Sequence, residues 1–567
     1  MPKKSSVGLC TTGFWTGAFG GLLAGVRAVE DLFRICTDGR RFFYHSKKVI
    51  SLSPGEYNDT EENLFINTVA EGVVNLELEF EKTAVSCLNR KIRDVQSQEQ
   101  TLELRLPEGM PDIGSVLGAW GQCILRGKEW RSSEIGVSGG VTVWVLYQPA
   151  DGSSPQSVEA WLPMQQKWGL TDCQREGVIR TKWYLKSADA RALSVRKLML
   201  RASVQVLVEV LEPMEAQIAQ PIELPPDIQL LRKEYPTRVP REAGEKTFQL
   251  EDVLPLPAGA VQPEKIVCCQ VLPMLTEQTV VGSKGVFRGN VRCHVLYLGE
   301  DGGFHSADPE LSFAQFEDLE RDYDEGATLS VMMDVTGFEP EVLDGQLRAK
   351  CGMTAQYMVH DRVMVDLVED AYSPIRNVTV STEPLNIPNV LDTGRRIINP
   401  EVGYSGGRVV DAVIYPEYPS VHRAGDLTEM EFPGTVQVLA YNDEGHLEGT
   451  QLRWNESWEL PVASGAQVQP VILSVTPPEI SGGRIMAEME VQADTISPDV
   501  GNGVTAMEAG DPAVPDPNRP SVILRRAGEG SLWDLAKKTG STVDAIWAAN
   551  QLTQEPMDDR ILLIPIP

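Results

Sequence analysis

The sequence is short of the residues from which most catalytic and metal sites are built. It has six histidines in 567 residues, and no two of them have the spacing of a zinc site. It contains no His-Glu-x-x-His motif and no glycine-rich phosphate loop. Two Gly-x-Ser-x-Gly strings, at 136–140 and 403–407, lack the strand-turn-helix context of a nucleophile elbow, and we interpret both as glycine-rich β-turns. We therefore expect no enzyme, with no catalytic residue, no cofactor and no metal ligand.

Cysteine is also scarce and unevenly placed. There are nine, none of them after Cys351, and no two form a C-x-x-C pair. An odd number without that spacing favours reduced thiols in a cytosol over a disulfide framework or a zinc site. The adjacent Cys268 and Cys269 can act as a redox sensor, but buried core cysteines are the simpler interpretation.

Long apolar runs are missing as well, so we expect no membrane span. The nearest candidate, 13–26, follows Lys3 and Lys4, but five of its fourteen residues are glycine and it is too short to cross a bilayer. We expect residues 1–74 to be a poorly ordered N-terminal extension, or even to begin at an over-extended start site. A secretion signal is the alternative.

Basic residues are outnumbered, 51 against 80 acidic ones, which gives a net charge of −29. Because no basic stripe is available for phosphates, we expect no nucleic-acid partner. One acidic run, 317–325, lacks the spacing of an EF-hand, and a solvated loop is a simpler interpretation than a cation site. Hydrophobic residues make up 42% of the chain, which is enough for packed cores over several domains.

What the sequence does contain is a threefold repeat. A glycine, a run of alternating apolar residues, a tyrosine and an acidic-glycine turn recur at Gly140–Tyr147, Gly289–Tyr297 and Gly434–Tyr441. Each copy has the period of two and the turn glycine of a β-hairpin, and helical periodicity is scarce around it. The repeat predicts three tandem β-sandwich-like domains.

Proline-rich segments separate the repeats and set the expected boundaries. A first linker contains Pro221, Pro225, Pro226, Pro236 and Pro240, and a second, rich in proline and glycine, precedes the C-terminus. The predicted domains are β-domain 1 at 75–212, a linker at 213–240, β-domain 2 at 241–373, β-domain 3 at 374–497, a linker at 498–519 and a terminal module at 520–567.

The terminal module has the order strand, helix, helix, strand. Ser531 and Ser541 each stand three residues before an aspartate, Asp534 and Asp544, which is the spacing of a capping box. Apolar runs at 522–524 and 561–564 flank the two helices. In so small a module we expect the aromatic residues Trp533 and Trp547 to belong to the core.

These residues resemble the LysM domain, whose pattern includes a Gly-Asp-Thr-Leu turn, Trp-(Asp/Ser)-Ile-Ala, an asparagine after the second helix and a final Ile-Pro. Here the turn departs from the pattern and reads Gly-Glu-Gly-Ser. The resemblance implies a small βααβ domain with a groove for N-acetylglucosamine polymers such as peptidoglycan. The groove residues it implies are Gly528, Glu529, Gly530, Ser531, Leu532, Asn550, Gln551, Leu552 and Thr553.

The wider arrangement resembles spore-coat-associated proteins in which repeated SPOCS domains precede a LysM domain, the SipL-like subgroup. The closest local match is Leu106–Leu117, which is similar to that family's Pro-x-x-x-Pro-Asp-Ile segment, whereas Leu254–Pro255 and Ile387–Pro388 are weak remnants. The resemblance covers roughly residues 75–567. It implies a non-enzymatic morphogenetic protein in the mother-cell cytoplasm, at the forespore surface. Its implied partner is the spore coat's morphogenetic ATPase scaffold, with the LysM domain as a protein-docking module.

Three functional hypotheses follow. The leading one is a scaffold for spore-coat assembly, because the reduced thiols and the altered turn favour a protein ligand over a glycan. The second is a peptidoglycan-binding protein of the cell wall or spore cortex, in which the β-domains act as spacers. The third, a wall-lytic enzyme, needs a catalytic carboxylate pair or a Cys-His set, and the sequence offers no convincing one.

Overall fold

The structure is a computed structural model that describes residues 76–566 except 172–175, 515–516, 528–529 and 555–559. Antiparallel strands dominate it, so the predicted mainly β fold is confirmed. The extension predicted at 1–74 lies outside the described residues. Residues 75–567 group into a single unit, and all that follows concerns that unit.

The first β-domain consists of two three-stranded sheets around one core. One sheet has the order β2 (Phe80–Arg105), β7 (Lys197–Pro221), β6 (Val178–Ser194). The other has the order β3 (Ile113–Trp130), β4 (Glu134–Pro149), β5 (Gln156–Gly169). Side chains that alternate inward from both sheets, such as Val141 and Val206, are fully buried between them. We call this domain sandwich 1.

Sandwich 2 repeats this plan. One sheet has the order β12 (Thr328–Leu343), β13 (Gln346–Tyr372), β8 (Gln229–Leu254). The other has the order β10 (Phe304–Ala307), β9 (Pro263–Gly299), β11 (Glu310–Tyr323). Near Gly282, whose φ is 59°, β9 turns back on itself, and Thr276 donates to the Arg288 carbonyl across the two arms. The arms of β9 therefore correspond to β3 and β4.

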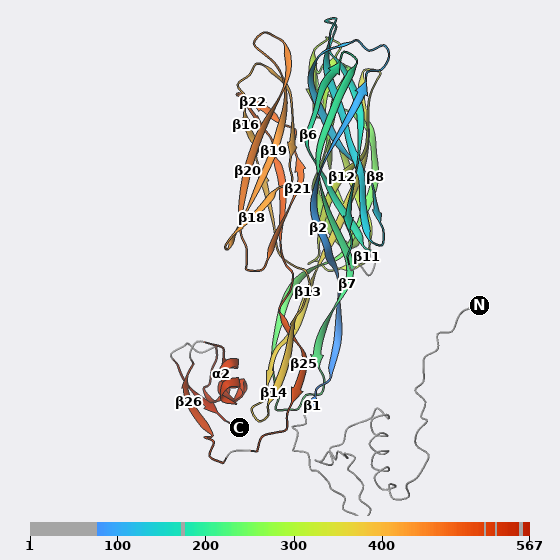
Figure 1. The fold of residues 1–567 in the computed structure, drawn as a ribbon. Coiled ribbons are helices and arrows are strands. Elements are labelled where there is room, and N and C mark those ends of the chain that lie inside the picture. The colour runs from blue at the N-terminus through green and yellow to red at the C-terminus, as the bar shows by residue number, and fades with distance from the viewer. Residues whose placement is uncertain (1–75, 172–175, 515–516, 528–529, 555–559, 567) are drawn as a thin grey trace, which may run out of the picture. The chain divides into compact units, whose positions relative to one another are not determined.

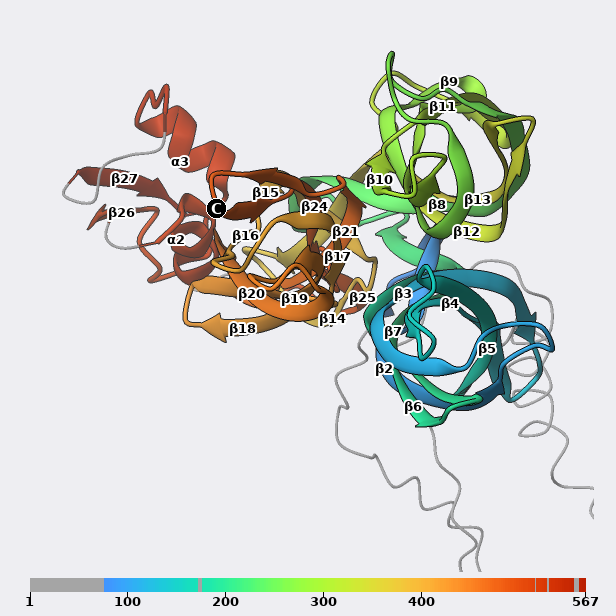
Figure 2. The same cartoon turned by 90° about the horizontal axis from the view of Figure 1, so that it is seen from above.

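Sandwich 3 is the most divided copy. One sheet has the order β15 (Asn389–Ile398), β24 (Met489–Ser497), β21 (Gln467–Val475). The second has the order β17 (Val409–Pro416), β19 (Leu427–Tyr441), β18 (Ser420–Ala424), with β20 (Leu447–Pro461) also on β19. A small third sheet contains β16 (Glu401–Gly403), β23 (Arg484–Met486) and β22 (Glu479–Ser481). Seen from above, the three sandwiches lie side by side around a common axis (Figure 2).

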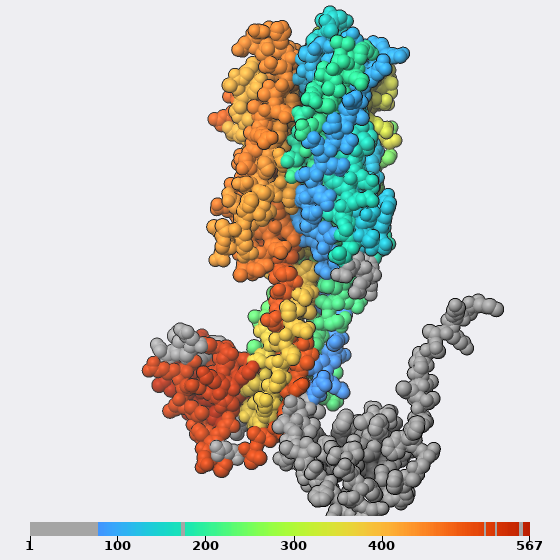
Figure 3. All heavy atoms as spheres, in the orientation of Figure 1, coloured from blue at the N-terminus to red at the C-terminus, as the bar shows by residue number. Residues whose placement is uncertain are grey.

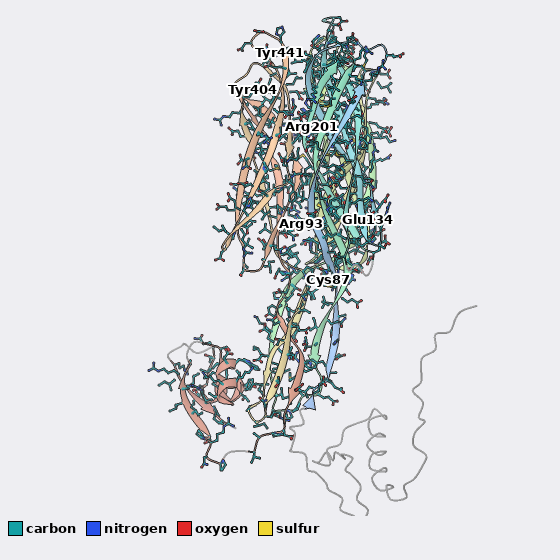
Figure 4. The ribbon with its side chains drawn as sticks, viewed as in Figure 1. Cys87, Arg93, Glu134, Arg201, Tyr404 and Tyr441 are labelled. Carbon is teal, nitrogen blue, oxygen red and sulfur yellow. The ribbon has the colours of Figure 1, made fainter. Side chains whose placement is uncertain are left out.

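The repeat tyrosines close the same corner in sandwiches 1 and 2. Tyr147 donates its hydroxyl to the Pro111 carbonyl at 3.0 Å, and Tyr297 donates to the Val261 carbonyl at 3.1 Å. Each carbonyl lies 36 residues before its tyrosine. Both tyrosines are buried, whereas Tyr441 of sandwich 3 is half-buried at the end of β19 (Figure 4). In sandwiches 1 and 2 the sequence marker is thus a buried tyrosine that fixes the loop before β3 or before β9.

Below the sandwiches, strands from all three domains form a shared base (Figure 1). A small sheet of the order β1 (Leu76–Glu77), β25 (Asn502–Ala509), β14 (Val378–Pro384) joins the lower ends of β2, β7, β8 and β13 there. Two apolar clusters fill the base. Their buried members are Leu78, Val85, Cys87, Ala216, Ile218, Ile228, Val239, Val365, Leu367, Val368, Ala371, Ile387, Val504, Met507 and Ala509. Because the third domain reaches the base through β14 and β25, the base binds the repeats together.

Much of what was expected to be linker is therefore strand. Within the predicted linker 213–240, β7 continues to Pro221 and β8 begins at Gln229, and β25 lies within the second predicted linker, 498–519. Proline is compatible with these strands because β8 is an edge strand and because β6 pairs with β7 only as far as Leu211. A high proline content here marks strand edges rather than an extended tether.

Candidate functional site

The predicted strand–helix–helix–strand order is present at the C-terminus. β26 (Val522–Arg526) pairs antiparallel with β27 (Ile561–Pro565), and α2 (Leu532–Thr539) and α3 (Val543–Ala549) lie between them in the chain. We call residues 520–566 the C-terminal module. Its buried core residues are Leu532, Trp533, Ala536, Ile546, Leu552, Leu562, Ile564 and Ile566.

The predicted capping box at the start of α2 is present. The Asp534 amide donates to the Ser531 hydroxyl at 3.2 Å, and the Ser531 amide donates to the Asp534 carboxylate at 3.2 Å. Gly540 ends the helix in the left-handed region, at φ 66°. Both ends of α2 are therefore satisfied by local sequence.

The predicted second cap is wrong by one residue. Thr542 precedes α3 in an extended conformation and accepts a hydrogen bond from the Ala545 amide at 3.1 Å. Ser541 is fully buried instead, and its hydroxyl donates to the Pro565 carbonyl on β27. Because Ser541 is engaged with the sheet, the next hydroxyl residue caps the helix.

The nine predicted groove residues do not form one exposed surface, because they differ in burial. Gly528 and Glu529 lie outside the described residues. Leu532 and Leu552 are buried in the module core, 3% and 6% exposed, so neither is placed to touch a ligand. The four that are exposed are Gly530, Ser531, Gln551 and Thr553.

The ninth, Asn550, has a structural role. Its side-chain amide donates to the Leu563 carbonyl at 2.6 Å and to the Ile546 carbonyl at 2.8 Å, and its Oδ1 accepts from the Leu563 amide at 2.8 Å. The side-chain amide of Asn550 thus joins the end of α3 to β27, acting both as donor and as acceptor. Those bonds explain an asparagine at this position without a ligand.

The module is packed against the base through one face of α2. The Trp533 indole donates to the Asp370 carboxylate at 2.8 Å, and Lys537 forms an ion pair with the same carboxylate at 2.7 Å. The Tyr372 ring meets the Trp533 ring edge-on, with centroids 4.7 Å apart, and its hydroxyl donates to the Ser541 carbonyl at 3.0 Å. Trp533 is buried as predicted, but part of its surroundings comes from β13.

The electrostatics of this contact match its geometry. Burial alone would raise the pKa of Asp370, but hydrogen bonds from Lys537 and Trp533 outweigh burial and lower it. Burial, with the Asp544 charge nearby, raises the pKa of Tyr372 to about 12. Asp370 is therefore ionised and Tyr372 protonated at neutral pH, which are the states that these bonds require.

The outer face of the module's two-stranded sheet is apolar and exposed. Leu524 and Leu563 lie opposite each other in register and are 68% and 43% exposed. Val522 and Ile561 extend the same face and are 49% and 62% exposed. We call these four residues the apolar face. Single exposed apolar residues are common, but a contiguous set on one sheet face is typical of an interaction surface.

Sandwiches 1 and 3 meet at a buried cluster of charges. Glu209, 2% exposed on β7, pairs with Arg93, with Arg180 at 3.0 Å and with Arg90 at 3.4 Å. Arg93 also donates to the Pro470 carbonyl of β21 at 2.8 Å. Arg93 lies on sandwich 1 where it faces sandwich 3 (Figure 4). Burial alone would raise the pKa of Glu209, but the three guanidinium charges outweigh burial and lower it to about 2.

Sandwiches 2 and 3 are joined by a buried histidine. His294 on β9 contacts Asp308 at 2.6 Å and Asp411 of β17 at 2.8 Å. Burial would lower the pKa of His294, but the two carboxylates, Asp411 above all, raise it to about 10. The imidazole is therefore charged at neutral pH and holds two sandwiches together.

These two buried charge clusters were missed in the sequence, and one signal for them was present. Glu209 interrupts the otherwise apolar segment 206–211, and a carboxylate in a buried strand implies a cationic partner. The partners themselves carry no such signal, because Arg90 and Arg93 are more than one hundred residues away in the sequence.

Other expected features also have clear outcomes. The string 136–140 lies within β4, and residues 317–323 of the acidic run 317–325 lie within β11, so the predicted turn and the predicted loop over these residues are wrong. Cys268 and Cys269 are buried, and burial raises the pKa of both thiols well above the ordinary range, as expected of core cysteines. No group of three or more potential metal ligands occurs within the described residues.

In the described part of the chain, neither helix has the length and hydropathy needed to cross a bilayer. No family model, curated protein or solved structure matches the chain.

Proposed function

We propose that the protein is a non-enzymatic scaffold for spore-coat assembly, acting on the mother-cell side at the forespore surface. Its partner in this proposal is the coat's morphogenetic ATPase scaffold, bound through the C-terminal module and the β-sandwiches. The repeat architecture and the final βααβ module support the proposal through the resemblance described above.

The observation that carries the proposal is the apolar face. Val522, Leu524, Ile561 and Leu563 present aliphatic side chains to solvent on one side of β26 and β27. Burying such side chains contributes about 25 cal/mol per Å² of apolar area, which favours a protein partner. A polar glycan gains much less from aliphatic side chains than from hydrogen-bonding groups and aromatic rings. The face therefore supports a protein ligand over a sugar.

The contact of the module with the base supports the same function. Trp533 and Lys537 of α2 bind Asp370 on β13, so α2 faces the base and the apolar face of the module remains exposed. A module held in this way presents its free face in a fixed orientation, which lowers the entropic cost of assembling a large complex.

Binding of the purified full chain to the purified coat ATPase tests this proposal. We expect the double variant L524S/L563S to weaken that binding at least tenfold, and the control I397S, an exposed isoleucine on sandwich 3, to leave it unchanged. Absence of binding by the unaltered chain, or equal loss in the control, would contradict the proposal. Circular dichroism checks that each variant is folded.

Peptidoglycan binding is the second candidate, and exposure of Gly530, Ser531, Gln551 and Thr553 favours it. The measurement is co-sedimentation of the full chain with insoluble peptidoglycan. Glycan binding through the loops predicts loss of co-sedimentation in Q551A/T553A and none in L524S/L563S. The reverse pattern would place glycan binding on the apolar face, and no co-sedimentation of the unaltered chain would rule out this candidate.

A further inference from the structure

A cavity of about 360 Å³ lies between sandwiches 2 and 3, away from the C-terminal module. Its volume lies within the range of small-molecule sites, roughly 300–1,000 Å³. Sandwich 2 provides part of the wall from β8, β9, β12 and β13, and sandwich 3 provides the rest from β15 and β24. The polar and charged lining residues are Arg238, Gln278, Thr279, Thr328, Ser330, His360, Thr393, Arg395 and Gln492.

The lining carries positive charge without a matching carboxylate. Arg238 is half-buried, and in the described part of the chain its guanidinium has no hydrogen bond or ion pair. Arg395 has one distant partner, Glu490, at 3.8 Å. No aspartate or glutamate is among the described residues that line the cavity.

Two buried polar side chains add hydrogen-bonding capacity. His360 is 5% exposed, and its ring has no hydrogen-bond partner among the described residues. Burial and the charges of Arg180, Arg90 and Arg238 lower the pKa of His360 to about 3, so its ring is neutral and offers one N–H. Gln492, also 5% exposed, has an Oε1 without a partner. Both side chains can therefore form hydrogen bonds with a ligand in the cavity.

Other lining groups are already oriented. Gln278 accepts from the Val331 amide at 2.9 Å through its Oε1, which leaves its Nε2 as a donor. Gln492 donates its Nε2 to Asp494 at 3.1 Å, and burial raises the pKa of that carboxyl. Asp494 therefore fixes the amide of Gln492 without adding a carboxylate to the lining.

We propose that this cavity is a binding site for a small oxyanion with at least two negative charges, either an organic phosphate or a di- or tricarboxylate. Two guanidinium groups recognise such groups through paired N–H donors, and the neighbouring amides and hydroxyls suit the remaining oxygens. The free Oε1 of Gln492 suits a ligand that also carries a hydroxyl. The site goes beyond the proposed scaffold function and does not depend on it.

Because its walls belong to two sandwiches, an anion in the cavity would also hold them together. Binding to the folded chain alone stabilises that state in proportion to the logarithm of ligand concentration. The ligand would thus act as a small-molecule control on the rigidity of the junction.

Isothermal titration of the full chain with pyrophosphate and, separately, with citrate at constant ionic strength tests the site. We expect saturable one-to-one binding of at least one of them, with R238Q and R395Q each raising the dissociation constant about tenfold or more. The control is R288Q, which removes an exposed guanidinium from the same sandwich and should leave binding unchanged.

Each outcome decides the proposal. Binding of pyrophosphate alone supports a phosphate ligand, and binding of citrate alone supports a carboxylate. Failure of both to bind saturably, or equal weakening by R288Q, overturns the site. Because Arg238 has no partner to lose, R238Q should fold, and R395Q provides a second variant if it does not.

Discussion

Buried or half-buried arginines occur both at the junction of sandwiches 1 and 3 and at the cavity between sandwiches 2 and 3. The two places differ in whether a carboxylate is present to pair with them. In the first, Glu209 from the chain itself pairs with Arg90, Arg93 and Arg180. In the second, Arg238 faces a cavity without a carboxylate. The two regions adjoin, since Arg180 contacts the Met358 sulfur of β13 at 3.7 Å and Arg238, Arg180 and Arg90 all act on His360.

The charge of Glu209 is therefore part of the fold, whereas the charge of Arg238 is available to a ligand. A buried ion cluster is costly to form, but once formed it is costly to break, because each remaining ion loses its partner. An arginine without a carboxylate partner can be replaced at little cost, because no ion pair is broken. Loss of charge at Glu209 should therefore destabilise the fold far more than loss of charge at Arg238, and mutation can test this.

The largest effect is expected from Glu209→Gln. It leaves three buried guanidinium groups short of their counter-charge and should lower the free energy of unfolding by about 3–5 kcal/mol. In the unaltered chain the pKa of Glu209, about 2, lies below the ordinary 4.5. The stabilisation from this carboxylate is therefore present above pH 4.5 and is lost as the pH falls towards 2. Urea denaturation of the full chain measures both effects.

The matched control is Glu99→Gln, which breaks an exposed ion pair with Arg201 on the same sandwich (Figure 4). An exposed pair of this kind contributes about 0–1 kcal/mol. If E209Q destabilised no more than E99Q, the buried cluster would not hold the junction together.

The next largest effect is expected at His294, the buried contact that joins sandwiches 2 and 3. His294→Gln removes charge-assisted bonds to Asp308 and Asp411 and should cost about 1.5–3 kcal/mol. The pKa of His294 is raised from 6.5 to about 10, so this contribution is complete below pH 6.5 and is lost as the pH rises through 10.

Denaturation of the unaltered chain and of H294Q at pH 6 and at pH 10 checks this prediction. The difference between the two proteins should shrink at the higher pH. The control H305Q removes a partly exposed histidine paired with Asp301 and should show a small difference at both values. A difference for H294Q that does not change with pH would mean that the histidine is not charged in the fold.

The sequence predicted the repeat but not how the repeats join. Period-two alternation and the tyrosines at 147, 297 and 441 predicted three β-rich units, and capping chemistry at Ser531 predicted α2, because these are local signals. The buried charges are not local. Arg90 binds Gln469, 379 residues away, and no local pattern predicts that contact. The cavity has no sequence signal either, since its lining comes from six strands of two domains.

The space-filling view shows sandwiches 1 and 3 in direct contact along their length, above the narrower base (Figure 3). The proline-rich segments were misinterpreted because much of them lies in the long strands β7 and β8. Pro213 and Pro221 lie in β7 and Pro236 and Pro240 in β8, where the free strand edge requires no backbone donor. Proline content alone cannot distinguish a strand edge from a linker, because in neither place must the backbone N–H donate a hydrogen bond.

A smaller effect is expected at the module, where the contact is shared between several groups. Trp533→Phe keeps the ring against Tyr372 but removes the bond to Asp370, which retains Lys537, so the loss should be about 0.5–1.5 kcal/mol. Amide hydrogen exchange should become faster in α2. The control W547F changes a half-buried tryptophan that makes no contact with Asp370, and equal acceleration in both variants would contradict a specific contact with the base.

The smallest effect should come from Arg238→Gln in a chloride buffer free of phosphate and carboxylates. With no partner to lose and like charges on Arg180 and Arg90 nearby, the variant should change the free energy of unfolding by no more than about 0.5 kcal/mol, or should raise it slightly. Urea denaturation measured beside E209Q is the direct comparison. A loss above about 2 kcal/mol would show that the Arg238 guanidinium is paired in solution, and the two junctions would then differ in degree rather than in kind. A near-zero change leaves this arginine available to a ligand, because the fold does not need its charge.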